Sequence, residues 1–192
     1  MSSIFTSTFR TLTSKSCLKT LPRNGIALLD SIKLREARPE DLAQILEIYN
    51  DAVLNTAATF DLEPHTLEAR REWFKAHDMH YPLIIAETHR NVAGYCCVSP
   101  YASKAGYSKT VELSVYVDRK YRRQGIATAL VQEIIGRTKG LGYHAIVSSI
   151  SSSNQQSVAL HRRLGFEFRG CLKHLGFKFG QWQDVSLYEL LL

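Results

Sequence analysis

The stretch that decides the fold is Val111-Glu112-Leu113-Ser114-Val115-Tyr116-Val117, followed after residues 118–121 by Arg122-Arg123-Gln124-Gly125-Ile126-Ala127-Thr128. The first segment is rich in β-branched and aromatic residues, and apolar and polar residues alternate at its start, which predicts a strand. The second segment opens a helix that Gly140 and Gly142 end. We therefore predict a strand, a glycine turn and a helix in direct succession.

This order also predicts an anion site at the start of the helix. Gly125 and Ala127 are small, so main-chain N–H groups can approach an anion closely. Those groups lie at the positive end of the helix dipole. Arg122 and Arg123 add positive charge at the entrance. On these residues alone, an ordinary strand-to-helix turn is an equally good interpretation.

Strand and helix patterns alternate on both sides of this unit. Pro39, followed by two acidic residues, opens a helix, and further helices are expected at 66–77 and 155–164. Strands are expected at 32–37, 83–87, 92–98, 145–150, 165–170 and 184–191. Together they predict one α+β (mixed α/β) domain over residues 32–192, with a central sheet flanked by helices.

Residues 1–31 differ in composition from this domain. They are rich in Ser and Thr, carry scattered Arg and Lys, and contain no acidic residue before Asp30. This composition resembles a transit peptide, which would direct the protein to mitochondria or plastids. A disordered extension, or a start codon placed too early, explains it equally well. We expect a cytoplasmic protein, or a mitochondrial one if the segment is a transit peptide.

Composition excludes several classes of protein. Hydrophobic residues make up 45% of the chain, but no apolar run approaches the roughly 20 residues of a membrane helix. The net charge of +6 fits an anionic cofactor, and no concentrated basic stripe indicates nucleic acid binding. No metal site is expected, because His77 and His80 lack a second pair of ligands. We expect free thiols, and hence a reducing compartment, because no CxxC pair occurs among Cys17, Cys96, Cys97 and Cys171.

Two motifs together resemble a known family. Arg122-x-x-Gly125-x-Ala127 is similar to the pyrophosphate motif, and residues 154–166 are similar to the second cofactor motif, of the GNAT superfamily of acyl-CoA N-acetyltransferases. The resemblance implies a mostly antiparallel, twisted central sheet whose strands splay near the motif. It also implies acetyl-CoA as cosubstrate, with a main-chain amide near Tyr116 or Val117 polarising the thioester carbonyl. The cofactor-binding residues implied are Val115, Tyr116, Val117, Arg122, Arg123, Gln124, Gly125, Ile126, Ala127, Thr128, Asn154 and Ser157.

Three further segments resemble the phosphinothricin N-acetyltransferase branch of this family: Thr110–Val117, Leu175–Asp184 and Thr59-Phe60-Asp61. The branch implies a homodimer and a small amino acid-like acceptor such as phosphinothricin, methionine sulfone or methionine sulfoximine. Lys104 stands in a loop where the branch usually has arginine, and lysine cannot form the same bidentate fork on a carboxylate. The candidate acceptor-binding residues are Phe60, Trp73, Lys104 and Tyr107, although core packing explains the three aromatic residues equally well.

The resemblance also implies two catalytic residues. Glu112 shares a strand face with Ser114 and Tyr116, and it is the candidate general base; a solvated strand glutamate is the alternative. His161 stands where many family members carry a tyrosine thought to protonate the leaving thiolate, so it can be acid or base; a packed histidine is the alternative. Two other functions remain open: an acetyltransferase of protein or peptide amines, and a catalytically silent acetyl-CoA-binding module.

Overall fold

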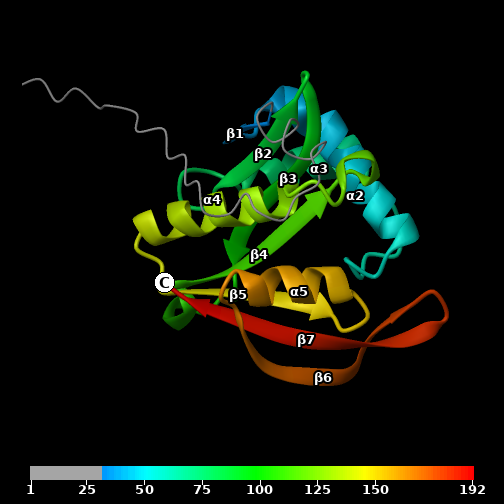
Figure 1. The fold of residues 1–192 in the computed structure, drawn as a ribbon, viewed down its shortest axis with the longest axis vertical. Coiled ribbons are helices and arrows are strands. Elements are labelled where there is room, and N and C mark those ends of the chain that lie inside the picture. The colour runs from blue at the N-terminus through cyan, green and yellow to red at the C-terminus, as the bar shows by residue number, and fades with distance from the viewer. Residues whose placement is uncertain (1–31) are drawn as a thin grey trace, which may run out of the picture.

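The computed structural model describes residues 32–192. The predicted N-terminal extension, residues 1–31, lies outside the described residues. A seven-stranded sheet runs through the domain in the order β1-β2-β3-β4-β5-β7-β6 (Figure 1). Its strands are β1 (Lys33–Glu36), β2 (Leu83–Thr88), β3 (Asn91–Pro100), β4 (Thr110–Val117), β5 (Ala145–Ser151), β6 (Glu167–Lys178) and β7 (Gln181–Leu191).

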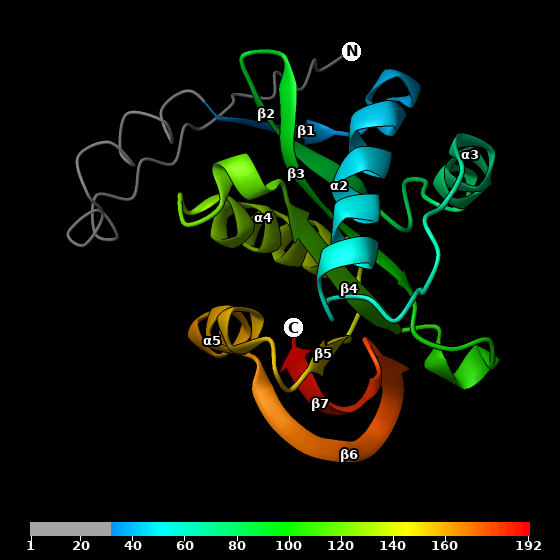
Figure 2. The ribbon, with the colours of Figure 1, turned by 90° about the vertical axis from the view of Figure 1, so that its right-hand side faces the viewer.

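Helices cover both faces of the sheet, as Figure 2 shows. On one face, α2 (Leu42–Asn55) and α3 (Leu67–Lys75) pack over β2 and β3. On the other, α4 (Ile126–Gly140) buries a stripe against the sheet, and α5 (Gln155–Arg163) lies beside it. The connecting segments contain three short 3₁₀ helices, η2 (Pro39–Asp41), η3 (Ala105–Tyr107) and η4 (Arg119–Tyr121). The predicted central sheet flanked by helices is confirmed.

The pairing between β4 and β5 is the exception within this sheet. All other neighbouring strands are antiparallel, but β4 and β5 run parallel. They pair over only three residues each, residues 110–112 of β4 with residues 145–147 of β5. Beyond Glu112 the two strands part, while β3 still pairs with β4 and β7 with β5 as far as their ends. The splay that the family resemblance implied is therefore present in the middle of the sheet.

The β6–β7 hairpin is longer than the sequence predicted. Strands were expected to end at residue 170 and to resume at 184, whereas β6 runs to Lys178 and β7 starts at Gln181. Register shifts at Phe168/Gly170 and Leu172/Gly176 interrupt the alternation of side chains between the two faces of the sheet. The sequence of β6 therefore lacks the alternating apolar pattern by which a strand is predicted. The prediction of a break between two short closing strands was wrong.

The far end of this hairpin supports the loop that follows α2. Gly176 packs against the ring of Phe60 so closely that an added Cβ would lie 2.4 Å from Phe60 Cε1. Nearby, Lys178 Nζ donates a hydrogen bond of 2.7 Å to the main-chain oxygen of Thr59. These contacts explain why the Thr59-Phe60-Asp61 and Leu175–Asp184 segments occur together: they touch in the fold.

Cysteines and histidines of the described residues form no metal centre. Cys96 and Cys97 are buried and free, as predicted, and burial raises the pKa of Cys97 to about 12. No group of three potential ligands among His, Cys, Asp and Glu occurs within residues 32–192. Over the same range, every helix is too short or too polar to cross a membrane.

Candidate active site

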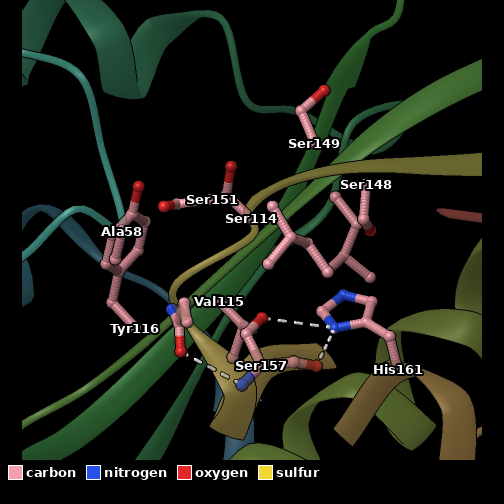
Figure 3. A pocket seen from close by; sticks show the side chains of 12 residues that line it. Ala58, Ser114, Val115, Tyr116, Ser148, Ser149, Ser151, Ser157 and His161 are labelled. Carbon is pink, nitrogen blue, oxygen red and sulfur yellow. Dashed lines mark hydrogen bonds between the residues drawn. The ribbon is translucent and has the colours of Figure 1, made fainter. Parts of the chain in front are cut away.

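The separation of β4 and β5 opens a cavity of about 60 Å³. Three elements meet there: the C-terminal half of β4, the C-terminal half of β5 and the first turns of α5 (Figure 3). A polar cavity of this volume has room for more than one water-sized group. Its lining residues are Ala58, Leu113, Ser114, Val115, Tyr116, Ser148, Ser149, Ile150, Ser151, Asn154, Ser157 and His161.

Strand β4 directs free main-chain groups into this opening. The N–H of Asp118 donates to Ala93 in β3 at 3.0 Å. Because bonding direction alternates along an antiparallel strand, Tyr116 also turns its N–H toward β3, and Val115 and Val117 turn theirs toward the opening. Of the two positions named for a polarising amide, Val117 turns its N–H toward the opening and Tyr116 does not; Val115 does so as well.

His161 lies at the α5 side of the cavity with only 2% of its surface exposed. Its Nδ1 lies 2.8 Å from the main-chain oxygen of Ser157. A carbonyl oxygen can only accept, so Nδ1 carries the proton and Nε2 of the neutral ring is an acceptor. Nε2 is buried and has no partner within the described residues. Burial lowers the pKa of His161 below its usual value, and this effect outweighs the hydrogen bond to Ser157, which raises the pKa. The ring is therefore neutral at pH 7.

Asn154 and Ser157 lie at the N-terminus of α5. Asn154 Oδ1 accepts a hydrogen bond of 3.1 Å from the Ser157 N–H, which caps the helix. The cap occupies the side-chain oxygen of Asn154, and its amide NH₂ donates to no group in residues 32–192. Asn154 thus has donors available to a ligand, and the structure places both predicted residues at the cavity.

Glu112 lies one hydrogen bond away from the cavity. It is half-buried, and its Oε1 accepts a hydrogen bond of 2.8 Å from Ser149 Oγ. Ser149 lines the cavity, whereas Glu112 does not. Sequence analysis missed Ser149, because a serine in a serine-rich strand carries no signal until the strand pairing is known.

The turn between β4 and α4 has the geometry of an anion site. Arg123 and Gly125 adopt positive φ of 63° and 82°, which turns successive main-chain N–H groups toward the same side. Within the described chain, the N–H groups of residues 123–128 donate no hydrogen bond. This turn and the first turn of α4 contain the predicted residues Gln124, Ile126, Ala127 and Thr128. Because free N–H groups at a helix N-terminus bind anions, the site fits a diphosphate.

The arginines around this site differ in their contacts. Arg123 is exposed and forms no ion pair within residues 32–192, so its charge is available to a ligand. Arg122 already has partners within the protein, because its Nε donates to Val117 O at 3.2 Å and its Nη2 lies 3.5 Å from Asp51 Oδ2. Arg163 of α5, which sequence analysis did not single out, donates to Thr128 Oγ1 and adds a further cation.

The four predicted acceptor-binding residues do not line the cavity. Phe60 packs on Gly176, and Trp73 packs on Tyr95 and His77. Lys104 is exposed just before η3, and Tyr107 is 45% exposed within it, edge-on to Tyr101. Phe60 and Trp73 are half-buried packing residues, while Lys104 and Tyr107 lie on a surface loop.

Comparison with known proteins identifies the family. Residues 34–187 match the acetyltransferase (GNAT) domain. The chain belongs to the GNAT acetyltransferase family. This enzyme is 40% identical over 164 residues to the L-methionine sulfoximine/L-methionine sulfone acetyltransferase of Pseudomonas paraeruginosa, with 84% of this chain and 95% of that protein covered. It is 35% identical over 162 residues to the phosphinothricin N-acetyltransferase of Streptomyces coelicolor, covering 82% and 95% of the two chains.

Among solved structures, this acetyltransferase is similar to the GNAT superfamily phosphinothricin acetyltransferase of Sinorhizobium meliloti in complex with acetyl-CoA. The TM-score is 0.81 at 35% identity, and the match covers 84% of this chain and 89% of that one. The predicted family, fold and acyltransferase activity are confirmed, with acetyl-CoA as the acetyl donor of the family.

The anion site yields a direct prediction. Replacing Gly125 by valine adds a branched side chain at a φ of 82° and crowds the N–H groups of the turn. We expect Gly125→Val to weaken coenzyme A binding about tenfold or more in isothermal titration calorimetry. Gly142→Val, which places the same strain at a φ of 75° beyond the other end of α4, is the control and should keep its affinity. Equal affinities in all three proteins would contradict the site.

Proposed function

We propose that this GNAT enzyme transfers the acetyl group of acetyl-CoA to the primary amine of a small amino acid-like acceptor. The observation that carries the proposal is the cavity between β4 and β5, which has a carboxylate relay at one side and an unprotonated imidazole nitrogen at the other. The relatives named for methionine sulfoximine, methionine sulfone and phosphinothricin support this acceptor class.

The reaction requires proton acceptors. When bound, acetyl-CoA supplies an activated thioester. The amine nitrogen forms a bond to the acetyl carbon and the carbon–sulfur bond breaks, giving an N-acetyl amine and a thiol. An acceptor that arrives as an ammonium ion loses two protons, of which one ends on the thiol and one reaches solvent. The enzyme therefore needs groups that take protons from nitrogen and a group that passes one to sulfur.

Glu112 and Ser149 supply the first of these. Ser149 Oγ donates to Glu112, so its lone pairs face away from the carboxylate and can accept a proton from the amine. A proton that enters at Ser149 Oγ can leave through the existing hydrogen bond to Glu112. Val115 and Val117 direct N–H groups into the same opening, where they stabilise charge on the carbonyl oxygen.

His161 supplies the second function. Its neutral ring presents an acceptor at Nε2, so it first takes a proton from the amine nitrogen and then passes that proton to the leaving thiolate. The sequence left the choice between acid and base open, and this neutral tautomer supports the proposal that His161 starts as a base.

A thiol-release screen tests this function. With acetyl-CoA, we expect turnover of L-methionine sulfone, L-methionine sulfoximine or phosphinothricin, and little of polyamines or peptides. Glu112→Gln should lower kcat about 100-fold, because an amide cannot take the proton that Ser149 passes on. Its affinity for acetyl-CoA, measured by calorimetry, should stay within about twofold.

The controls separate the rival functions. Glu47→Gln changes an exposed carboxylate on α2 and should leave kcat unchanged. Turnover of peptides but not free amino acids would favour an enzyme of protein amines. Tight acetyl-CoA binding with no thiol release from any amine would favour a silent binding module. Full activity in Glu112→Gln would remove Glu112 from the mechanism.

The pH dependence tests His161. Burial lowers its pKa, so the neutral base persists below pH 6.5, the ordinary histidine value. We expect kcat to fall only at lower pH, as Nε2 becomes protonated. In His161→Gln, kcat should drop about 100-fold and this acid limb should disappear. His80→Gln, at a side chain that is 67% exposed, should show the wild-type profile. An unchanged acid limb in His161→Gln would assign the limb to another group.

We also propose that the enzyme is a homodimer that pairs through the β6–β7 hairpin. β6 is an edge strand of the sheet and leaves main-chain groups free for pairing. Large apolar side chains lie exposed along the same hairpin, and apolar surface gathered in this way marks an interface. A second copy is the occupant we assign, because an edge strand can pair with its own symmetry mate. The exposed residues are Phe168, Leu172, Leu175, Phe177, Phe179 and Trp182.

Sedimentation velocity tests the assembly. The wild-type protein should sediment as a dimer at micromolar concentration. Phe177→Glu places a charge on this apolar surface and should give monomers. Leu54→Glu, at a 55% exposed side chain of α2, is the control and should leave the dimer intact. A monomeric wild-type protein, or dimers in all three cases, would contradict the assignment.

A further inference from the structure

Arg70 is the most unusual charged residue of the described chain. It lies on α3 with only 2% of its surface exposed. Its Nε and Nη2 are buried without a hydrogen-bond partner, and no carboxylate in residues 32–192 forms a salt bridge with it. Asp61, an acidic residue of the neighbouring loop, is already engaged by Tyr49 and His65. Burying a charge without a partner is costly, so a ligand is expected where the protein supplies none.

Aromatic rings hold the guanidinium in place. Its central carbon lies 4.0 Å from the ring centroid of Tyr49 and 4.3 Å from that of Trp73. Contacts of this kind stabilise the cation and cover its faces, and they leave the N–H groups at its edge to make hydrogen bonds. The rings therefore fix the orientation of a planar donor fork.

Arg70 reaches the cavity through two aromatic rings: its guanidinium lies over Tyr49, and the ring centroid of Tyr49 is 5.3 Å from that of Tyr116. Burial raises the pKa of Cys97 to about 12, and the nearby charge of Arg70 opposes that rise. The charge acts in the same direction on the buried phenol of Tyr116. Cys97 is the register partner of Ser114, and paired residues of neighbouring strands present adjacent side chains on one face. Ser114 and Tyr116 both line the cavity, so Arg70 is separated from it by the aromatic pair Tyr49 and Tyr116.

We propose that Arg70 binds the carboxylate of the amino acid acceptor and so determines its specificity. An α-amino acid carries its amine and its carboxylate on one carbon. With the carboxylate on the guanidinium fork of Arg70, the amine projects toward Ser114 and the Ser149–Glu112 relay. This assignment rests on the proposed function and replaces Lys104, which is exposed on a surface loop, as the carboxylate-binding residue.

The test compares two acceptors: L-methionine sulfone and its decarboxylated analogue, which keeps the amine and the sulfone. We expect Arg70→Met to raise KM for the amino acid about 50-fold, with little change for the analogue. Arg70→Lys, which keeps the charge but not the fork, should give an intermediate KM. Arg71→Met removes the next residue of α3, whose side chain is 57% exposed, and should behave as wild type, as should Lys104→Met.

Binding measurements keep the test independent of turnover. Calorimetry of L-methionine sulfone with the coenzyme A complex should show the same loss in Arg70→Met, while coenzyme A affinity and the urea midpoint serve as checks on folding. Equal losses for both acceptors, or no loss for either, would overturn the assignment. If wild type acetylates neither acceptor, the proposed function fails; carboxylate binding that still depends on Arg70 would then support the subsite alone, and carboxylate binding unaffected by Arg70→Met would overturn it.

Discussion

The site depends on the loss of pairing between two parallel strands after only three residues. β4 and β5 are joined from Thr110–Glu112 to residues 145–147 and then part, while their outer neighbours hold each of them in the sheet. The break leaves the N–H groups of Val115 and Val117 without strand partners in the middle of the domain. Because buried main-chain groups need hydrogen bonds, this opening is prepared for an extended polar ligand.

The same break brings three kinds of group to one place. Main-chain donors come from β4, the Glu112–Ser149 hydrogen bond spans the two strands at the last paired position, and α5 closes the opening with His161. The free N–H groups of residues 123–128 follow β4 along the chain, after η4 and at the start of α4. A cosubstrate with a diphosphate at one end and a thioester at the other fits this order.

The sequence predicted those parts of the site that are local along the chain. Gly125 as a helix start, the helix over 155–164 and the run from Val111 to Val117 as a strand all follow from neighbouring residues, and the structure confirms them. The central sheet and its flanking helices were predicted for the same reason. The β6–β7 hairpin was missed beyond residue 170, because two register shifts break the alternation that identifies a strand.

Contacts between distant segments could not be predicted in this way. Ser149 matters because β5 lies beside β4, and Lys178 because the hairpin returns to the loop after α2. Ser149 has no local signal, and Lys178 was indicated only by its place in the Leu175–Asp184 segment that resembles the family branch. Lys104 and Tyr107 were assigned to the acceptor by their place in a family motif, and they lie on a surface loop away from the cavity.

Arg70 shows how a side chain without a motif becomes informative. From the sequence alone it is one arginine among several on an amphipathic helix, and such residues usually face solvent. In the structure its side chain is buried instead, with the rings of Tyr49 and Trp73 beside the guanidinium. No carboxylate of the described chain offsets the cost of burying this charge. Because proteins are only marginally stable, an unfavourable burial of charge is retained where the buried charge binds a ligand. An anionic ligand then meets a guanidinium that is already oriented and desolvated.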